Sequence, residues 1–68
     1  MMEDLNQFPG DPMPVVGNWY WVVAWPGDKG QRGMYTGGTG SQMPPFVDAN
    51  FRAVGLARCW WRELRPGE

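Results

Sequence analysis

Residues 18–25 read Asn-Trp-Tyr-Trp-Val-Val-Ala-Trp, and this stretch decides the fold. Most of its side chains are aromatic or β-branched, a composition that favours a β-strand. Successive side chains of a strand point to opposite faces, so the segment has two apolar faces: Trp19, Trp21, Val23 and Trp25 on one, and Tyr20, Val22 and Ala24 on the other. A strand with two apolar faces is predicted to lie centrally in a sheet or to be covered by another element.

The next segment, Pro-Gly-Asp-Lys-Gly at 26–30, predicts a turn. Proline presets φ, glycine permits a positive φ, and the aspartate side chain can accept a hydrogen bond from nearby backbone. Residues 31–36 then predict the returning strand of a hairpin, with Met34 and Tyr35 opposite the tryptophan-rich strand. We expect the three tryptophans of the first strand to form the core, with Tyr35 opposite them.

The composition excludes several ways of stabilising so short a chain. A domain of 68 residues buries only about 60% of the surface that its unfolded chain exposes. Cys59 is the single cysteine, so no disulfide can form within the chain, and the lack of histidine argues against zinc. The carboxylates are too scattered for a calcium loop. We therefore predict no metal and no cofactor, and a core that depends on the aromatic residues, five of which are tryptophan.

Residues 46–65 allow two predictions, of which the first is a helix over 49–65. Its apolar side chains recur with a period of 3.6 residues and its arginines fall on the opposite side. Asp48 could cap the start of the helix, and the Pro-Gly pair at 66–67 would end it. Gly55 inside the helix would cost about 1 kcal/mol relative to alanine.

The second prediction for this stretch is a set of strands. The adjacent tryptophans at 60 and 61 suit a strand better than a helix, and Gly55 suits a β-bulge. This interpretation gives a strand at 46–47, a turn at 48–50, a strand at 51–54, and a last strand at 56–61 that pairs with the tryptophan-rich hairpin.

Two segments carry a resemblance to a known group of proteins. The run Trp-Arg-Glu-Leu-Arg-Pro at 61–66 resembles the terminal Trp-x-x-Leu-Pro signature of short phage- and prophage-encoded proteins of unknown function. Residues 25–35 are similar to their Pro-x-x-Gly-x-x-Val-Leu-Val-Tyr segment, although Gly33 stands where they have an aliphatic residue. The resemblance implies a β-rich fold and a phage origin, and it implies no activity.

With the resemblance, the predicted fold class is all-β. We expect a small twisted antiparallel sheet or an SH3-like half-barrel. The alternative is an α+β fold, in which the tryptophan-rich hairpin packs with a C-terminal helix over 49–65.

Prolines at positions 9, 12 and 14 shape the start of the chain. Proline is incompatible with a helix interior and cannot donate to a β-ladder. We therefore predict an extended proline-rich arm over 1–16, with neither helix nor ladder strand, followed by a single small domain over 17–68.

We expect neither an export signal nor a membrane span in this chain. The acidic start at 1–4, Met-Met-Glu-Asp, differs from the basic start of a signal peptide. No apolar run reaches the roughly 18 residues that a membrane span needs. We expect no membrane association and a cytoplasmic location, which is the host cytoplasm for a phage product; the virion is the alternative.

Catalysis is not predicted. General acid–base chemistry near neutral pH most often uses histidine, which is absent. Cys59 lies among apolar residues, which is typical of an inert structural thiol. We therefore predict a protein that is not an enzyme and has no catalytic residues.

Protein binding is the predicted function, because tryptophan, arginine and methionine are enriched in the cores of interfaces. In a strand, Trp60 would face outward with the arginines, and Trp61 would face the core. The predicted partner-binding residues are Trp60, Arg58, Arg62, Trp25 and Met43.

The predicted function is therefore that of a non-enzymatic interaction module, a small phage accessory protein that binds and modulates a host protein. A minor structural or decoration subunit of the virion is one alternative, and the chain could also associate with itself. A single-stranded nucleic-acid binder is a further alternative, because bases stack on alternating arginine and tryptophan planes. The net charge of −1 makes nucleic acid the less favoured partner.

Overall fold

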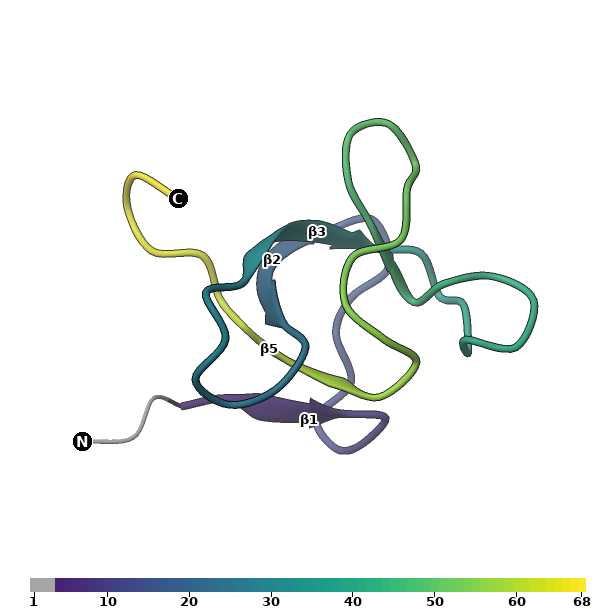
Figure 1. Ribbon diagram of the computed structural model, residues 1–68, viewed down its shortest axis with the longest axis horizontal. Coiled ribbons are helices and arrows are strands. Elements are labelled where there is room, and N and C mark those ends of the chain that lie inside the picture. Colours follow the sequence, from purple (N-terminus) through teal and green to yellow (C-terminus); the bar gives the residue numbers. More distant parts are fainter. Residues whose placement is uncertain (1–3) are drawn as a thin grey trace.

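Five strands form one antiparallel sheet in the computed structural model, which describes residues 4–68 (Figure 1). Their order across the sheet is β1-β5-β2-β3-β4. No helix is present among the described residues, so the all-β prediction is confirmed and the alternative helix over 49–65 does not form. The strands are β1 (Asn6–Phe8), β2 (Trp19–Val23), β3 (Gln31–Tyr35), β4 (Phe46–Val47) and β5 (Cys59–Arg62).

The predicted hairpin is formed by β2 and β3. Its turn is closed by the backbone N–H of Asp28, which donates to the carbonyl oxygen of Trp25 at 3.0 Å. Gly27 has a φ of 98°, which glycine adopts readily and other residues rarely do. A proline followed by a glycine with positive φ is the pattern of a type II turn, so the turn chemistry predicted for residues 26–30 is confirmed.

The second half of the chain contributes β4 and β5, and the connection between them begins with a tight turn at 48–52. The Asp48 side chain fixes this turn, because it accepts the backbone N–H groups of Asn50 and Arg52 at 2.8 and 3.0 Å. The strand predicted at 51–54 is reduced to a single bridge between Ala53 and Val47. Because residues 48–52 form a turn, the segment of this half that pairs with β2 is the tryptophan-rich strand β5.

The first strand corrects the expectation that residues 1–16 contain no ladder strand. β1 pairs with β5, with Asn6 opposite Trp61 and Phe8 opposite Cys59. The reason is that Pro9 follows β1 directly, so the three residues before it keep their N–H groups for the ladder. The first three residues of the predicted arm lie outside the described residues.

The core lies on the inner face of a strongly curved sheet (Figure 1). Phe8, on the edge strand β1, lies 5.5 Å from Tyr35 on β3 and 5.6 Å from Phe46 on β4, measured between ring centroids. The two edges of the sheet therefore meet across the core. Eight buried residues form this core: Phe8, Tyr20, Val22, Tyr35, Phe46, Val54, Cys59 and Trp61. The side chains of Val23 and Val47 are also buried but do not belong to this cluster.

The expectation that the tryptophans of β2 form the core with Tyr35 is wrong. Tyr20 and Val22 point inward, whereas Trp19 and Trp21 are half-buried on the opposite face and Trp25 is 58% exposed. Two features of the packing explain this arrangement. The inner face is tight, and the opposite face of β2 has arginines as its cross-strand neighbours.

The tightness of the inner face is clearest at Gly33. A Cβ atom at this position would lie 3.1 to 3.2 Å from side chains of Val22, Phe46 and Val54, closer than ordinary van der Waals contact. The core therefore takes rings of the size of phenylalanine and tyrosine at this point, and the indoles of β2 lie outside.

Candidate functional site

Three tryptophans and two arginines project from the side of the sheet opposite the core. We call this surface the Trp/Arg face, and it consists of Trp19, Trp21, Arg32, Trp60 and Arg62. The register of the strands builds it, because Arg32 on β3 and Arg62 on β5 both lie opposite Trp21 on β2. Trp60 lies opposite Val23. All three indoles are half-buried, so each ring packs partly on the sheet and meets solvent with the rest.

Two of the three rings of this face, Trp19 and Trp21, are held in place by polar contacts. The guanidinium of Arg32 lies over Trp19, 5.4 Å from its ring centroid, and that of Arg62 lies over Trp21 at 5.5 Å. Both distances are within the range of cation–π attraction. The indole N–H of Trp21 donates to the carbonyl oxygen of Lys29 at 3.1 Å. A surface fixed in this way loses little conformational entropy when it binds a partner.

Arg62 is also bound by the end of the described chain, in a segment at 62–68 that we call the tail clasp. Its two terminal nitrogens donate to the two carboxylate oxygens of Glu68, each at 2.7 Å. The guanidinium also donates to the carbonyl oxygen of Glu63 at 3.0 Å, and the backbone N–H of Arg65 donates to Glu68 at 2.7 Å. The Arg62 side chain is 9% exposed and that of Glu68 22%. The hydrogen bond from Arg62 lowers the pKa of Glu68 from 4.5 to about 2.

This lowered pKa predicts that the tail clasp stabilises the fold in a pH-dependent way. A carboxyl whose pKa is lower in the folded state stabilises that state above its unfolded pKa, and the stabilisation is lost as the pH falls toward the folded value. We expect the difference in melting temperature between the natural chain and Glu68→Gln to be constant above about pH 4.5 and to vanish as the pH approaches about 2. Thermal melts of both proteins across this range measure it. A difference that does not change with pH would contradict the charged pair.

The residues predicted to bind a partner do not form one surface. Trp60 lies on the Trp/Arg face, and Arg58 is exposed just before β5. Arg62 is on the same face but lies buried in the tail clasp. Trp25 and Met43 are 58% and 49% exposed, in the turn before β3 and in the loop after it, at opposite ends of that strand.

The two adjacent tryptophans of β5 divide between the two faces, as the alternation of a strand predicts. Trp61 is 4% exposed, and its ring lies 4.7 Å from that of Tyr20. Trp60 is half-buried on the Trp/Arg face. Phe8, on the neighbouring strand β1, points into the core and leaves Trp60 uncovered by its ring.

Four residues were not predicted from the sequence: Trp19, Trp21 and Arg32 of the Trp/Arg face, and Glu68 of the tail clasp. For the first three, a signal exists in the hairpin pattern. When the turn is centred on Pro26 and Gly27, Arg32 faces the same side as the tryptophans, which marks that side as the one facing solvent. For Glu68 the signal is the Pro-Gly pair before it, which returns the chain toward β5.

Cys59 has the surroundings of a structural thiol. Its side chain is fully buried, and this burial raises its pKa from 9.0 to about 11. The thiol is therefore protonated at neutral pH, and a protonated thiol is a poor nucleophile.

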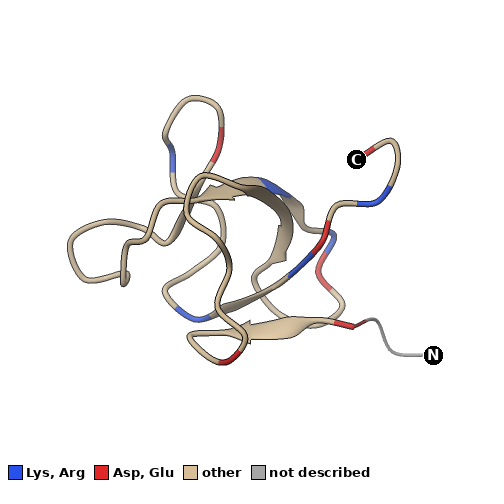
Figure 2. Ribbon diagram, turned by 180° about the vertical axis from the view of Figure 1, so that it is seen from behind, with Lys and Arg blue, Asp and Glu red and all other residues tan. Residues whose placement is uncertain are grey.

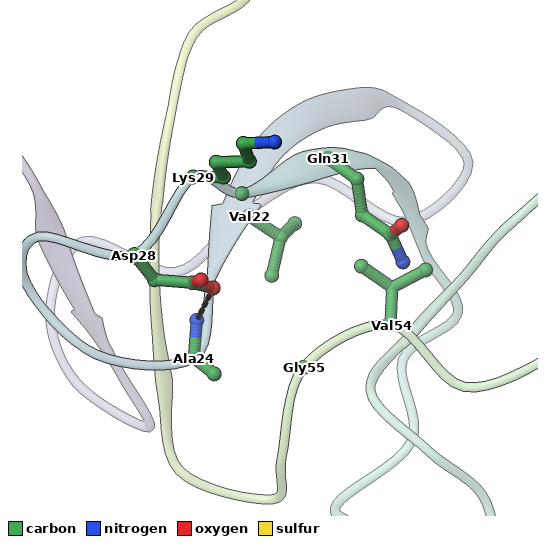
Figure 3. Close-up of a pocket in the computed structure, with 8 residues that line it drawn as sticks. Val22, Ala24, Asp28, Lys29, Gln31, Val54 and Gly55 are labelled. Atoms are coloured by element: carbon green, nitrogen blue, oxygen red, sulfur yellow. Dashed lines mark hydrogen bonds between the residues drawn. The ribbon is translucent and has the colours of Figure 1, made fainter.

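A hollow of about 190 Å³ lies beside the turn between β2 and β3 (Figure 3). Val22 and Val54 form part of its wall, and Asp28 and Lys29 line the side of the turn. The Asp28 carboxylate accepts the backbone N–H of Ala24 at 3.2 Å, so it serves to hold the turn. The hollow is wide open and its lining is largely polar, unlike the concave and mostly apolar pockets that bind most small molecules.

Comparisons with models of protein families, with curated proteins and with solved structures find no match to this chain. Within residues 4–68, no three side chains of the kinds that bind metals gather in one place. The same residues include no helix of the length and apolarity needed to cross a bilayer. The Trp/Arg face is therefore the feature of the described structure with the clearest chemical character.

Proposed function

We propose that this chain is a non-enzymatic interaction module whose Trp/Arg face binds another protein. The observation that carries the proposal is that three indoles on one face of the sheet are half-buried and so partly open to water, while cation–π contacts and a hydrogen bond hold two of them in place. Tryptophan and arginine are the residues that contribute most to binding energy at interfaces. Large apolar surface kept rigid and partly open to water is typical of a binding site.

Charge favours a protein over a nucleic acid as the partner. The chain has a net charge of −1. Among the described residues, basic positions lie on strands and in loops, and acidic positions lie in the loops and end segments beside them (Figure 2). Arg62 is already paired with a carboxylate. Binding to a phosphate backbone depends on many unpaired cations. Single-stranded nucleic acid is the second candidate, because the exposed Arg32 beside Trp19 could stack on bases.

The resemblance to short phage-encoded proteins supports a more specific proposal. In it, the chain is a small phage accessory protein that binds and modulates a host protein in the host cytoplasm. A minor component of the virion and a self-associating protein are the other forms that the proposal can take, and the identity of the captured partner distinguishes them.

Trp60 gives the sharpest test of the proposal. Trp60→Ala is expected to lose the partner almost completely, because central interface tryptophans commonly contribute 2 kcal/mol or more, which is about thirtyfold in affinity. The loss of stability should be only about 1 kcal/mol, since the ring is half-buried. The measurement is capture from a lysate of the presumed bacterial host on the immobilised natural and variant chains, with quantitative mass spectrometry and with melting curves of both proteins.

Leu56→Ala is the matched control, because Leu56 is 60% exposed but lies in a loop outside the Trp/Arg face. A protein captured equally by the natural chain and by Trp60→Ala would contradict the proposal. Binding to a single-stranded oligonucleotide that weakens steeply between low and physiological salt would favour the nucleic-acid candidate instead.

A further inference from the structure

The bond between Arg62 and Glu68 has the geometry of a recognition site. Two parallel N–H···O contacts of 2.7 Å join the guanidinium to the carboxylate. This fork-to-fork arrangement is stronger and more specific than a contact through one hydrogen bond. The ring of Trp21 lies on another side of the same guanidinium, 5.5 Å from its central carbon. Arg62 is thus oriented by an aromatic ring and presents both nitrogens to one carboxylate.

The residue that fills this position arrives on a preformed turn. The backbone N–H of Glu68 donates to the carbonyl oxygen of Arg65 at 3.0 Å, and Gly67 has a φ of 88°. Pro66 followed by a glycine of positive φ is the sequence of a type II turn. The carboxylate is therefore presented by a short turn, a shape that segments of other proteins also adopt.

We propose that Arg62 and Trp21 form a carboxylate-binding site on the Trp/Arg face, which Glu68 occupies in the free chain and which an acidic side chain of a partner protein takes over on binding. The inference rests on the proposed function, since it names the chemistry of that partner at the same face. The partner carries an aspartate or glutamate on a tight turn, flanked by apolar residues that cover the neighbouring indoles.

Two observations connect this site to the rest of the face. Arg62 and Arg32 lie opposite Trp21 from either side, so the three form one row across β5, β2 and β3. Arg32 is exposed and lies over Trp19. A partner that displaces Glu68 therefore meets a second arginine and a second indole in the same row.

Because Glu68 already occupies the site, a carboxylate from outside the chain must compete with it for Arg62. A group tethered by a short segment acts at an effective concentration in the millimolar range. Removal of the Glu68 carboxylate should therefore lower the concentration at which a carboxylate added from solution binds Arg62.

The experiment uses the full chain carrying Glu68→Gln and, as probe, an acetylated and amidated peptide of the sequence Arg-Pro-Gly-Glu, which copies residues 65–68. The readout is the indole N–H resonance of Trp21, followed by NMR during titration with the peptide. We expect saturable shifts with Glu68→Gln, and at least about tenfold more peptide for the same shift with the natural chain. The peptide with glutamine in place of glutamate should cause no saturable shift with either protein.

Glu63→Gln is the matched control, because it removes the same charge from an exposed neighbour and should behave like the natural chain. Adding Arg62→Lys to Glu68→Gln should abolish the response, since lysine keeps the charge but loses the bidentate fork. The inference is overturned if Glu68→Gln does not respond, or if it responds equally to both peptides. If Trp60→Ala loses the partner but Glu68→Gln does not respond to the peptide, the proposed function stands and only the carboxylate-binding site is disproved.

Discussion

Phe46→Ala is expected to unfold most of the protein at room temperature. The side chain is completely buried, and its ring packs edge-on against two others and tilted against a third: Phe8 at 5.6 Å, Tyr20 at 6.4 Å and Tyr35 at 5.4 Å. Truncating a buried phenylalanine costs about 3–5 kcal/mol. A small domain has little more stability than this to lose, so one ring decides whether the chain folds.

Phe51→Ala makes the same chemical change at a surface position. Phe51 is 74% exposed in the turn at 48–52 and has a φ of 60°. Alanine and phenylalanine are both strained at this φ, so the substitution changes only exposed side-chain atoms and should cost within about 0.5 kcal/mol. Unfolding by urea, followed by circular dichroism, compares the two variants. Equal stability of Phe46→Ala and Phe51→Ala would show that the aromatic cluster does not hold the fold.

The sequence predicts the hairpin because its signals are local. Strand propensity in β2, the Pro-Gly turn and the return through β3 all lie within 17 consecutive residues, from Trp19 to Tyr35. The short β1 has no such signal. Its three residues become a strand only because they pair with β5, more than 50 positions along the chain, and no local propensity shows a pairing of that range.

The direction of the β2 side chains could not be predicted from apolarity alone, since both of its faces are apolar. We expected the larger side chains to face inward, and the core instead takes Tyr20 and Val22. The deciding features are Gly33, which leaves a tight space on the inner face, and Arg32, which faces the tryptophans. Both become visible only when the register of the hairpin is considered.

Part of the Trp/Arg face could be predicted and part could not. Strand alternation places Trp60 outside and Trp61 inside, and the structure has this arrangement. The pairing of Arg62 with Glu68 was hidden because the Pro-Gly pair at 66–67 suggested the end of a helix. A proline followed by glycine is compatible both with the end of a helix and with a type II turn. Only the turn brings the Glu68 carboxylate back to β5.

Gly30→Ala is expected to be the most damaging change on the outer side of the sheet. Gly30 has a φ of 79°, and a side chain in this region costs about 1–2 kcal/mol. A Cβ atom there would also lie 2.5 Å from the indole nitrogen of Trp21 and 2.6 Å from a methyl carbon of Val23. Overpacking of this kind adds about 1–3 kcal/mol, so the total expected loss is about 2–5 kcal/mol.

Gly27→Ala separates the two causes. Gly27 has a φ of 98° in the same turn, but no atom lies within 4 Å of the position that its Cβ would take. Gly27→Ala should therefore lose only the free energy that the strained backbone costs. In urea unfolding, the free energy of unfolding of Gly30→Ala should be lower than that of Gly27→Ala by the cost of overpacking. Equal losses of stability would mean that Trp21 moves aside freely. If the losses differ, Trp21 is confined between Gly30, the Lys29 carbonyl and Arg62, and the Trp/Arg face is a fixed surface before any partner arrives.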